Sequence, residues 1–128
     1  MEFSQQPDEQ KVFSAIWALE SEVNNGGFEQ YFGNASGETA SFAPVALQRI
    51  GANQCAAIVS KALAVVGPGP FPTARDTRDD LMSSLSDDAC EELSALDSQF
   101  FAYPDDLTEL LFEFVRANPQ AFGPVAMT

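Results

Sequence analysis

The chain has 128 residues, of which 19 are aspartate or glutamate and 6 are lysine or arginine, so its formal net charge is −13. This excess argues against direct binding to nucleic acids or anionic membranes, because both are polyanions. The chain contains no histidine, which excludes Ser-His-Asp and Cys-His catalysis and histidine-based zinc sites. With 45% apolar residues, it can bury the core of a single domain over residues 1–128.

Apolar residues recur with a helical period between breaks made of Gly, Pro and Asn. The first helix is predicted over residues 8–23, and Asn24-Asn25-Gly26-Gly27 ends it, because Asn and Gly accept the left-handed conformation of a helix C-terminus. A short segment, 28–32, follows, and the Gly- and Ser-rich residues 33–41 are predicted to form a loop. The apolar stripe of the first helix consists of Val12, Ala15, Ile16, Leu19 and Val23, widened by Phe13 and Trp17.

The remaining helices are predicted in the same way. Two of them span residues 43–50, with Pro44 in the first turn, and 52–66, and a glycine ends each one. A Gly/Pro-rich connector leads to three further helices over 77–85, 87–101, where Ser86 is the N-cap, and 105–117. No segment has the alternation of a strand. We therefore expect an all-α fold, a single compact domain of six to seven helices.

The negative charge is concentrated in the second half of the chain. Residues 76–113 contain 12 acidic side chains and one arginine, so this segment has a net charge of −11. Helical spacing places acidic residues on single helix faces: Asp88, Glu91 and Glu92 on one helix, and Asp105, Glu109 and Glu113 on the next. If these helices lie side by side as two rods, net charges are spaced roughly 2.6 Å apart, against about 1.7 Å for duplex DNA.

This charge allows two interpretations. It is either a solvated face that serves solubility, in which first-turn aspartates complement helix dipoles, or a surface that recognises a basic partner. The candidate residues of such a surface are Asp80, Asp87, Asp88, Glu91, Glu92, Asp105, Asp106, Glu109 and Glu113.

Residues 20–34 have the unusual sequence E-S-E-V-N-N-G-G-F-E-Q-Y-F-G-N. This segment resembles the E-x-E-V-N-N-G-G-F-x-Q-Y/F-F signature of a family of small acidic domains, named after a bacterial DNA-mimic protein and otherwise of unknown function. The resemblance extends in order over about residues 10–118, through 43–52, 71–72, 96–97 and 100–115. It implies an all-α fold. For the member that gives the family its name, it implies an acidic surface that occupies the DNA-binding site of a helix-turn-helix repressor, with a dimer presenting the charge.

The motif itself also allows two interpretations. Its amides could cap helix ends at a tight corner that aromatic side chains anchor in the core. Alternatively, its polar groups could line a small cleft between Asn24 and Asn34 that binds a ligand. The motif residues concerned are Glu22, Asn24, Asn25, Gly26, Gly27, Phe28, Gln30, Tyr31 and Phe32.

Catalysis is not expected. Glu20 with Glu22 and Asp79 with Asp80 are paired carboxylates, but no nucleophile motif or phosphate loop accompanies them. No cofactor or metal is expected, and Cys55 and Cys90 lack the spacing of a metal site and are predicted to be small buried side chains. Without a signal peptide or a membrane-length apolar run, we expect a cytoplasmic protein.

We therefore expect an interaction protein, a DNA mimic whose acidic face occupies the DNA-binding surface of a basic transcription factor, nucleoid protein or nuclease. Homodimer formation is compatible with this expectation. The alternatives are an immunity-type inhibitor of a basic toxin or nuclease, and a small-ligand-binding domain that uses the cleft.

Overall fold

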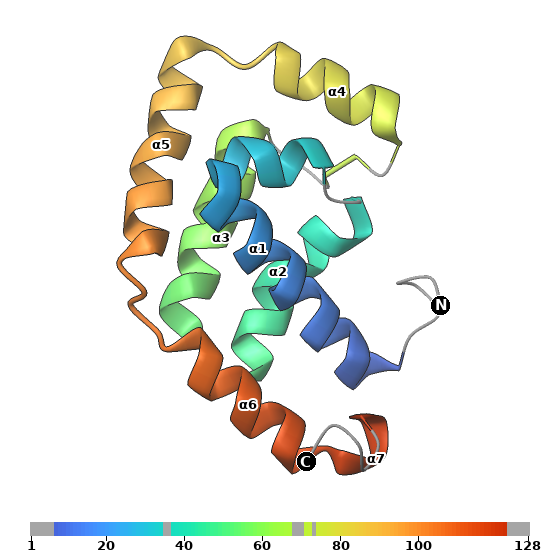
Figure 1. Ribbon diagram of the computed structural model, residues 1–128. Coiled ribbons are helices and arrows are strands. Elements are labelled where there is room, and N and C mark those ends of the chain that lie inside the picture. Colours follow the sequence, from blue (N-terminus) through green and yellow to red (C-terminus); the bar gives the residue numbers. More distant parts are fainter. Residues whose placement is uncertain (1–6, 35–36, 68–70, 73, 123–128) are drawn as a thin grey trace.

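The computed structural model describes residues 7–34, 37–67, 71–72 and 74–122, and the structural statements below concern these ranges. Within them the chain forms seven helices and no strand (Figure 1). The helices are α1 (Asp8–Asn34), α2 (Gly37–Arg49), α3 (Asn53–Val66), α4 (Arg75–Ser83), α5 (Asp87–Phe101), α6 (Leu107–Ala117) and α7 (Pro119–Phe122). The prediction of a compact all-α domain with six to seven helices is confirmed.

Helix α1 lies at the centre of the fold and packs against α2, α4 and α5. The predicted apolar stripe of α1, from Val12 to Val23, is fully buried. Trp17, which we expected to widen that stripe, is 63% exposed, so this part of the prediction is wrong. Its side chain points away from the buried stripe, because neighbouring helical residues project about 100° apart. The Trp17 ring stacks instead on that of Phe13, with centroids 6.0 Å apart.

The predicted break at residues 24–27 is present as a kink inside α1. Gly26 and Gly27 have non-helical backbone angles, and Gly27 has a φ of 77°, which lies in the left-handed region that glycine accepts without strain. The chain then resumes a helix at once and continues to Asn34. The two arms of α1 therefore meet at a corner, as the motif predicts.

The predicted loop over residues 33–41 is wrong. Residues 33–34 end α1 and residues 37–41 open α2, while residues 35–36 lie outside the described part of the chain. Pro44 consequently lies inside α2 and not in its first turn. The proline removes one helical hydrogen bond, but packing of the apolar stripe of α2 outweighs that loss. This stripe consists of the buried residues Ala40, Ala43, Ala46 and Leu47.

The end of α2 and the whole of α3 agree with the sequence. Gly51 has a φ of 86°, and the amide of Ala52 donates to the carbonyl of Leu47 at 2.8 Å, which is a glycine-terminated helix end. Helix α3 is within one residue of its prediction and ends before Gly67. The central residues of the predicted connector, 68–70, lie outside the described residues.

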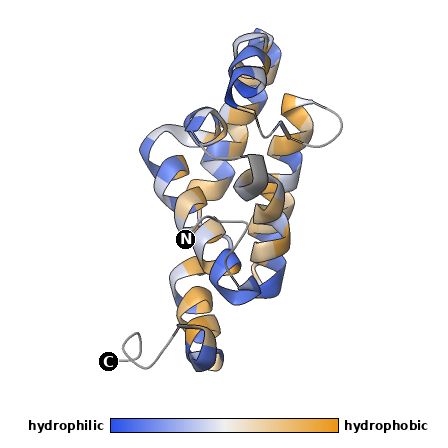
Figure 2. Ribbon diagram, turned by 90° about the vertical axis from the view of Figure 1, so that its right-hand side faces the viewer, coloured by the Kyte–Doolittle hydropathy of each residue, from blue (hydrophilic) through white to orange (hydrophobic). Residues whose placement is uncertain are grey.

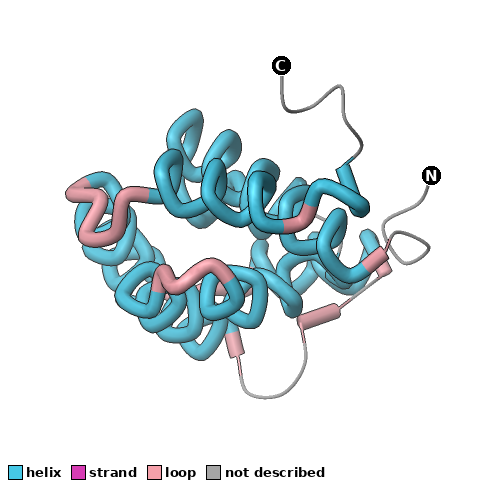
Figure 3. Tube along the Cα trace, turned by 90° about the horizontal axis from the view of Figure 1, so that it is seen from below, coloured by secondary structure: helices cyan, strands magenta, loops and turns pink. Residues whose placement is uncertain are grey.

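Helices α4, α5 and α6 follow one another around the outside of α1, α2 and α3 (Figure 1). Hydrophilic and hydrophobic residues share most helices (Figure 2), as amphipathic helices packed on a common core require. Viewed from below, short loops join α4 to α5 and α5 to α6 (Figure 3). Helix α5 has its predicted bounds, and the Ser86 hydroxyl caps it by accepting from the Ala89 amide at 3.1 Å. Helix α4 begins and ends two residues before its prediction.

Candidate functional site

The first two turns of α5 carry four exposed carboxylates. They belong to Asp87, Asp88, Glu91 and Glu92, and in the part of the chain that the structure describes none of them has a hydrogen bond or ion pair through its carboxylate. Asp87 and Asp88 lie in the first turn, where the helix dipole stabilises negative charge. Glu91 and Glu92 lie beyond that turn, so these like charges remain close together without an ion pair among the described residues.

The carboxylates of α4 and α6 continue this acidic surface. Asp80 on α4 is exposed, and so are Asp106, Glu109 and Glu113 at the start and along the outside of α6. Asp106 caps α6 by accepting from the Glu109 amide at 3.1 Å. Glu113 lies 3.5 Å from Arg116, an exposed pair that contributes about 0.5 kcal/mol or less. These side chains keep most of their charge facing solvent.

Asp105 does not belong to this exposed surface, which corrects its sequence assignment. Helix α6 begins at Leu107, so Asp105 precedes the helix and does not share a helix face with Glu109. Its carboxylate accepts a hydrogen bond from the Cys55 amide at 2.8 Å and one from the Gln54 side chain at 3.3 Å. Because α3 has no side-chain cap of its own, Asp105 satisfies a free amide in its first turn.

The acidic helices α5 and α6 lie end to end along one margin of the molecule (Figure 1), not side by side as the estimate of two rods assumed. Two adjacent rods would double the charge density along their common axis. Helices placed end to end do not, so the net negative charges stay about 5 Å apart. The surface is therefore a curved acidic line whose axial charge density is about a third of that of a DNA duplex.

The polar side chains of the motif bond to one another and to the loop after α5. Glu22 accepts hydrogen bonds from Gln30 at 2.7 Å and Asn34 at 3.3 Å. Asn24 donates to the hydroxyl of Tyr103 at 2.9 Å, and that hydroxyl donates to Glu20 at 2.8 Å. The amide side chain of Asn24 therefore joins two segments and does not cap a helix end, which corrects the predicted role of the motif amides. Asn25 is exposed.

Asp97 performs the capping role at the corner, and the sequence did not predict it. Its carboxylate accepts a hydrogen bond from the Phe28 amide at 2.8 Å, a group that has no helical partner because the backbone breaks at Gly27. Partial burial raises the pKa of Asp97 above its usual range. A Cβ atom at Gly27 would collide with the same carboxylate. The sequence signal that could have identified it is the position of Asp97 beside Leu93, Leu96 and Phe100, within the apolar stripe of this helix.

Aromatic side chains hold the corner in the core, as predicted. Phe28, Tyr31 and Phe32 are fully buried, and Phe28 meets Phe100 of α5 edge to face at 5.9 Å between centroids. The hydroxyl of Tyr31 has no hydrogen-bond partner among the described residues, and burial raises the pKa of this tyrosine. These contacts favour a structural role for the motif.

Among the described residues, no group of three His, Cys, Asp or Glu side chains is arranged to hold a metal ion. None of the described helices combines the length and apolar character that crossing a membrane requires. Both cysteines are free, and Cys55 is buried as predicted, whereas the prediction is wrong for Cys90, which is only partly buried. Burial raises the pKa of the Cys55 thiol to about 11, and desolvation together with Glu29 raises that of Cys90, so both thiols are protonated at neutral pH.

Comparison with known proteins confirms the family resemblance. No curated protein and no solved structure matches the chain significantly. A family model described as DMP19-like protein matches residues 4–118, which contain the corner motif and all the acidic residues of α4, α5 and α6. The chain belongs to the DMP19-like protein family.

Proposed function

We propose that this protein is a DNA mimic that occupies the DNA-binding surface of a basic partner, such as a helix-turn-helix regulator. The observation that carries the proposal is the set of exposed, unpaired carboxylates on α5: Asp87, Asp88, Glu91 and Glu92. In this mechanism carboxylates take the place of phosphates as partners for Lys and Arg, and long-range charge steers the encounter. Asp80, Asp106, Glu109 and Glu113 extend the contact.

A binding role is better supported than a catalytic one. The carboxylates of the motif are engaged, Glu20 with Tyr103 and Glu22 with Gln30, and the two thiols are protonated at neutral pH. The mutual hydrogen bonds of the motif also favour its structural role over the ligand-binding alternative.

The test is capture of partners from native lysate on the immobilised protein at low salt, followed by release with competing duplex DNA. The variant Asp87→Asn/Asp88→Asn removes two charges from the first turn of α5. Its matched control, Asp8→Asn/Glu9→Gln, removes two charges from the first turn of α1, which lies far from the start of α5 (Figure 1). We expect DNA-binding proteins that duplex DNA releases, with retention lowered by the α5 variant alone.

Equal retention by the two variants would contradict the proposal, because binding would then follow total charge and not its position. The same experiment separates the rival interpretation, an immunity-type inhibitor. In that case the captured partner is a nuclease or toxin whose activity our protein inhibits, and competing duplex DNA does not release this partner.

A further inference from the structure

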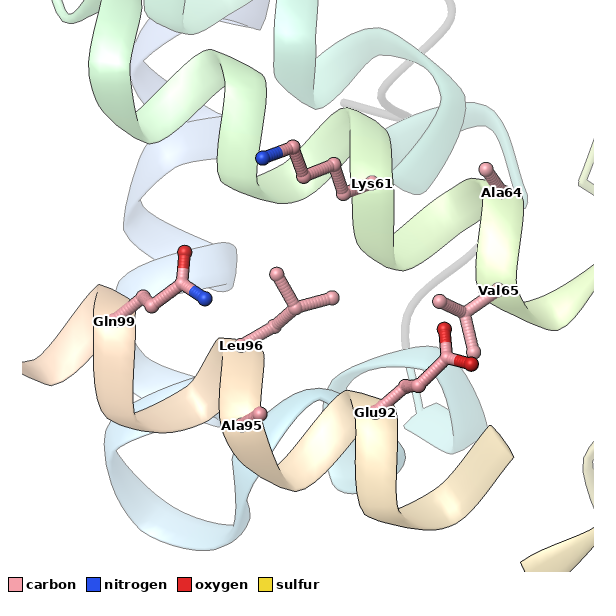
Figure 4. A pocket seen from close by; sticks show the side chains of 7 residues that line it. All are labelled: Lys61, Ala64, Val65, Glu92, Ala95, Leu96 and Gln99. Atoms are coloured by element: carbon pink, nitrogen blue, oxygen red, sulfur yellow. The ribbon is translucent and has the colours of Figure 1, made fainter. Parts of the chain in front are cut away.

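An open groove runs between α3 and α5 beside the acidic turns (Figure 4). Its volume is about 430 Å³, within the range of sites that accept a side chain or a small ligand. The residues that line it are Lys61, Ala64 and Val65 of α3 and Glu92, Ala95, Leu96 and Gln99 of α5.

The groove exists because small residues face each other across the two helices. Leu96 is buried, with 6% of its surface exposed, and Val65 is half-buried, so together they form an apolar floor. Ala64 and Ala95 are exposed on the rims, and neither has a side chain long enough to cover that floor. The apolar surface therefore stays open to solvent.

The two ends of the groove differ in charge. Lys61 and Gln99 lie at one end and Glu92 at the other (Figure 4), and among the described residues Lys61 and Glu92 form no ion pair. Asp88 precedes Glu92 by one helical turn on the same face of α5. The Glu92 end therefore opens onto the acidic surface, while the Lys61 end repels cations.

We propose that this groove receives an apolar side chain of the basic partner, from a segment whose Lys or Arg residues pair with Asp88, Glu91 and Glu92. This inference rests on the proposed function and specifies the partner segment. Charge complementarity selects the occupant, because the carboxylates lie at one end of an apolar floor and require cations next to the apolar residue. A phosphate backbone offers no such floor, so the groove gives the partner a contact that DNA does not provide.

The groove contact differs from the charge contact in its response to salt. Ion pairs on an exposed surface weaken as salt is added, whereas burial of an apolar side chain does not depend on screening. Covering roughly half of the surface of one leucine side chain should lower Kd about tenfold.

The test uses two synthetic helical peptides rich in lysine and arginine, which differ in one central residue, leucine or serine. Binding to the full chain is measured by calorimetry at about 0.15 M and about 0.5 M salt. Ala95→Phe fills the groove without changing charge, and Ala57→Phe makes the same change at an exposed alanine of α3 outside the groove.

We expect the leucine peptide to bind the unaltered protein about tenfold more tightly than the serine peptide at both salt concentrations. Ala95→Phe should reduce that ratio to about one, and Ala57→Phe should leave it unchanged. A ratio of one in the unaltered protein, or a ratio that survives Ala95→Phe, would overturn the inference. Self-association of the protein that Ala95→Phe abolishes would also overturn it, because a second copy would then occupy the groove.

The two proposals fail in different ways. If Asp87→Asn/Asp88→Asn does not weaken either peptide while the leucine preference persists, the charge-based function fails and the groove remains. If that variant weakens both peptides equally and the leucine preference is absent, the function stands and the groove inference fails.

Discussion

At the scale of single residues, two carboxylates of the acidic segment hold distant parts of the chain together. Asp97 accepts from the Phe28 amide and Asp105 from the Cys55 amide, each where a helix begins without a side-chain cap of its own. Both bonds join segments 50 or more residues apart. Counting acidic residues therefore overstates the surface that is free to bind a partner, since these two carboxylates are already engaged.

We predict that Asp97→Ala lowers the free energy of unfolding by about 1–3 kcal/mol, because the partly buried Phe28 amide loses its acceptor. Urea unfolding followed by circular dichroism measures the change. Asp88→Ala, on the same helix but exposed, should change stability by less than about 1 kcal/mol. Equal effects of the two substitutions would show that the Phe28 amide finds another partner.

Asp97 also predicts a pH dependence. Its pKa is raised in the folded state, so the folded protein binds a proton more readily than the unfolded chain. The stability of the unaltered protein relative to Asp97→Asn should therefore rise as pH falls through the folded-state pKa to the unfolded value near 3.8. Unfolding curves at a series of pH values measure this difference. A difference that shrinks on acidification would contradict the direction of the shift.

At the scale of the helices, the sequence predicts the breaks between helices better than the extent of the helix after each break. The corner at Gly26-Gly27 and the ends at Gly51 and Ser86 are local chemistry, and each lies at its predicted place. The extension of α2 through Pro44 depends on the packing of Ala40, Ala43 and Leu47, which local propensity does not include. The sequence likewise does not reveal that Asp105 anchors α3, because that contact spans 50 residues.

The same substitution should have different effects at two glycines of α1, one at the corner and one beyond it. Gly27→Ala should destabilise by about 1–3 kcal/mol, since the left-handed backbone disfavours alanine and its Cβ would collide with Asp97. Gly33→Ala meets nothing within 4 Å and lies in the second arm of α1, so it should be neutral or stabilise by up to about 1 kcal/mol. Thermal melts of both variants check the signs. Loss of stability at Gly33 alone would contradict the assigned geometry.

The position of Asp105 predicts mutational effects that differ from those of its acidic neighbours. Asp105→Ala should lower the free energy of unfolding by about 1–2 kcal/mol through the unsatisfied amide at Cys55. Glu109→Ala, in the first turn of α6, should lower it by less than about 1 kcal/mol. In partner binding we expect the reverse order, with Glu109→Ala the more damaging of the two. Urea unfolding and calorimetric titration together distinguish the two roles.

At the scale of the whole molecule, the amount of charge was readable from the sequence and its arrangement was not. The net charge of −11 belongs to residues 76–113 by composition alone. Its layout depends on the loop between α5 and α6, where Tyr103 takes a positive φ of 50° and bonds to Asn24 and Glu20. That loop directs α6 away from the side of α5, so the acidic line is curved and the groove beside α5 stays uncovered.

The unpaired charge on α5 predicts how stability responds to salt. Raising NaCl from about 0.01 M to about 1 M shortens the screening length from about 30 Å to about 3 Å and weakens the repulsion between neighbouring carboxylates, so the free energy of unfolding should rise.

Glu91→Gln/Glu92→Gln should stabilise the protein at low salt by about 0.2–0.5 kcal/mol for each like-charge pair removed and reduce the response to salt. The control Asp8→Asn/Glu9→Gln should destabilise slightly, because it removes charges favoured by the α1 dipole and the Glu9 contact with Arg49 at 3.9 Å. If the α5 variant is less stable than the unaltered protein at low salt, its carboxylates are held by partners within the fold and are not available for the binding role proposed for them.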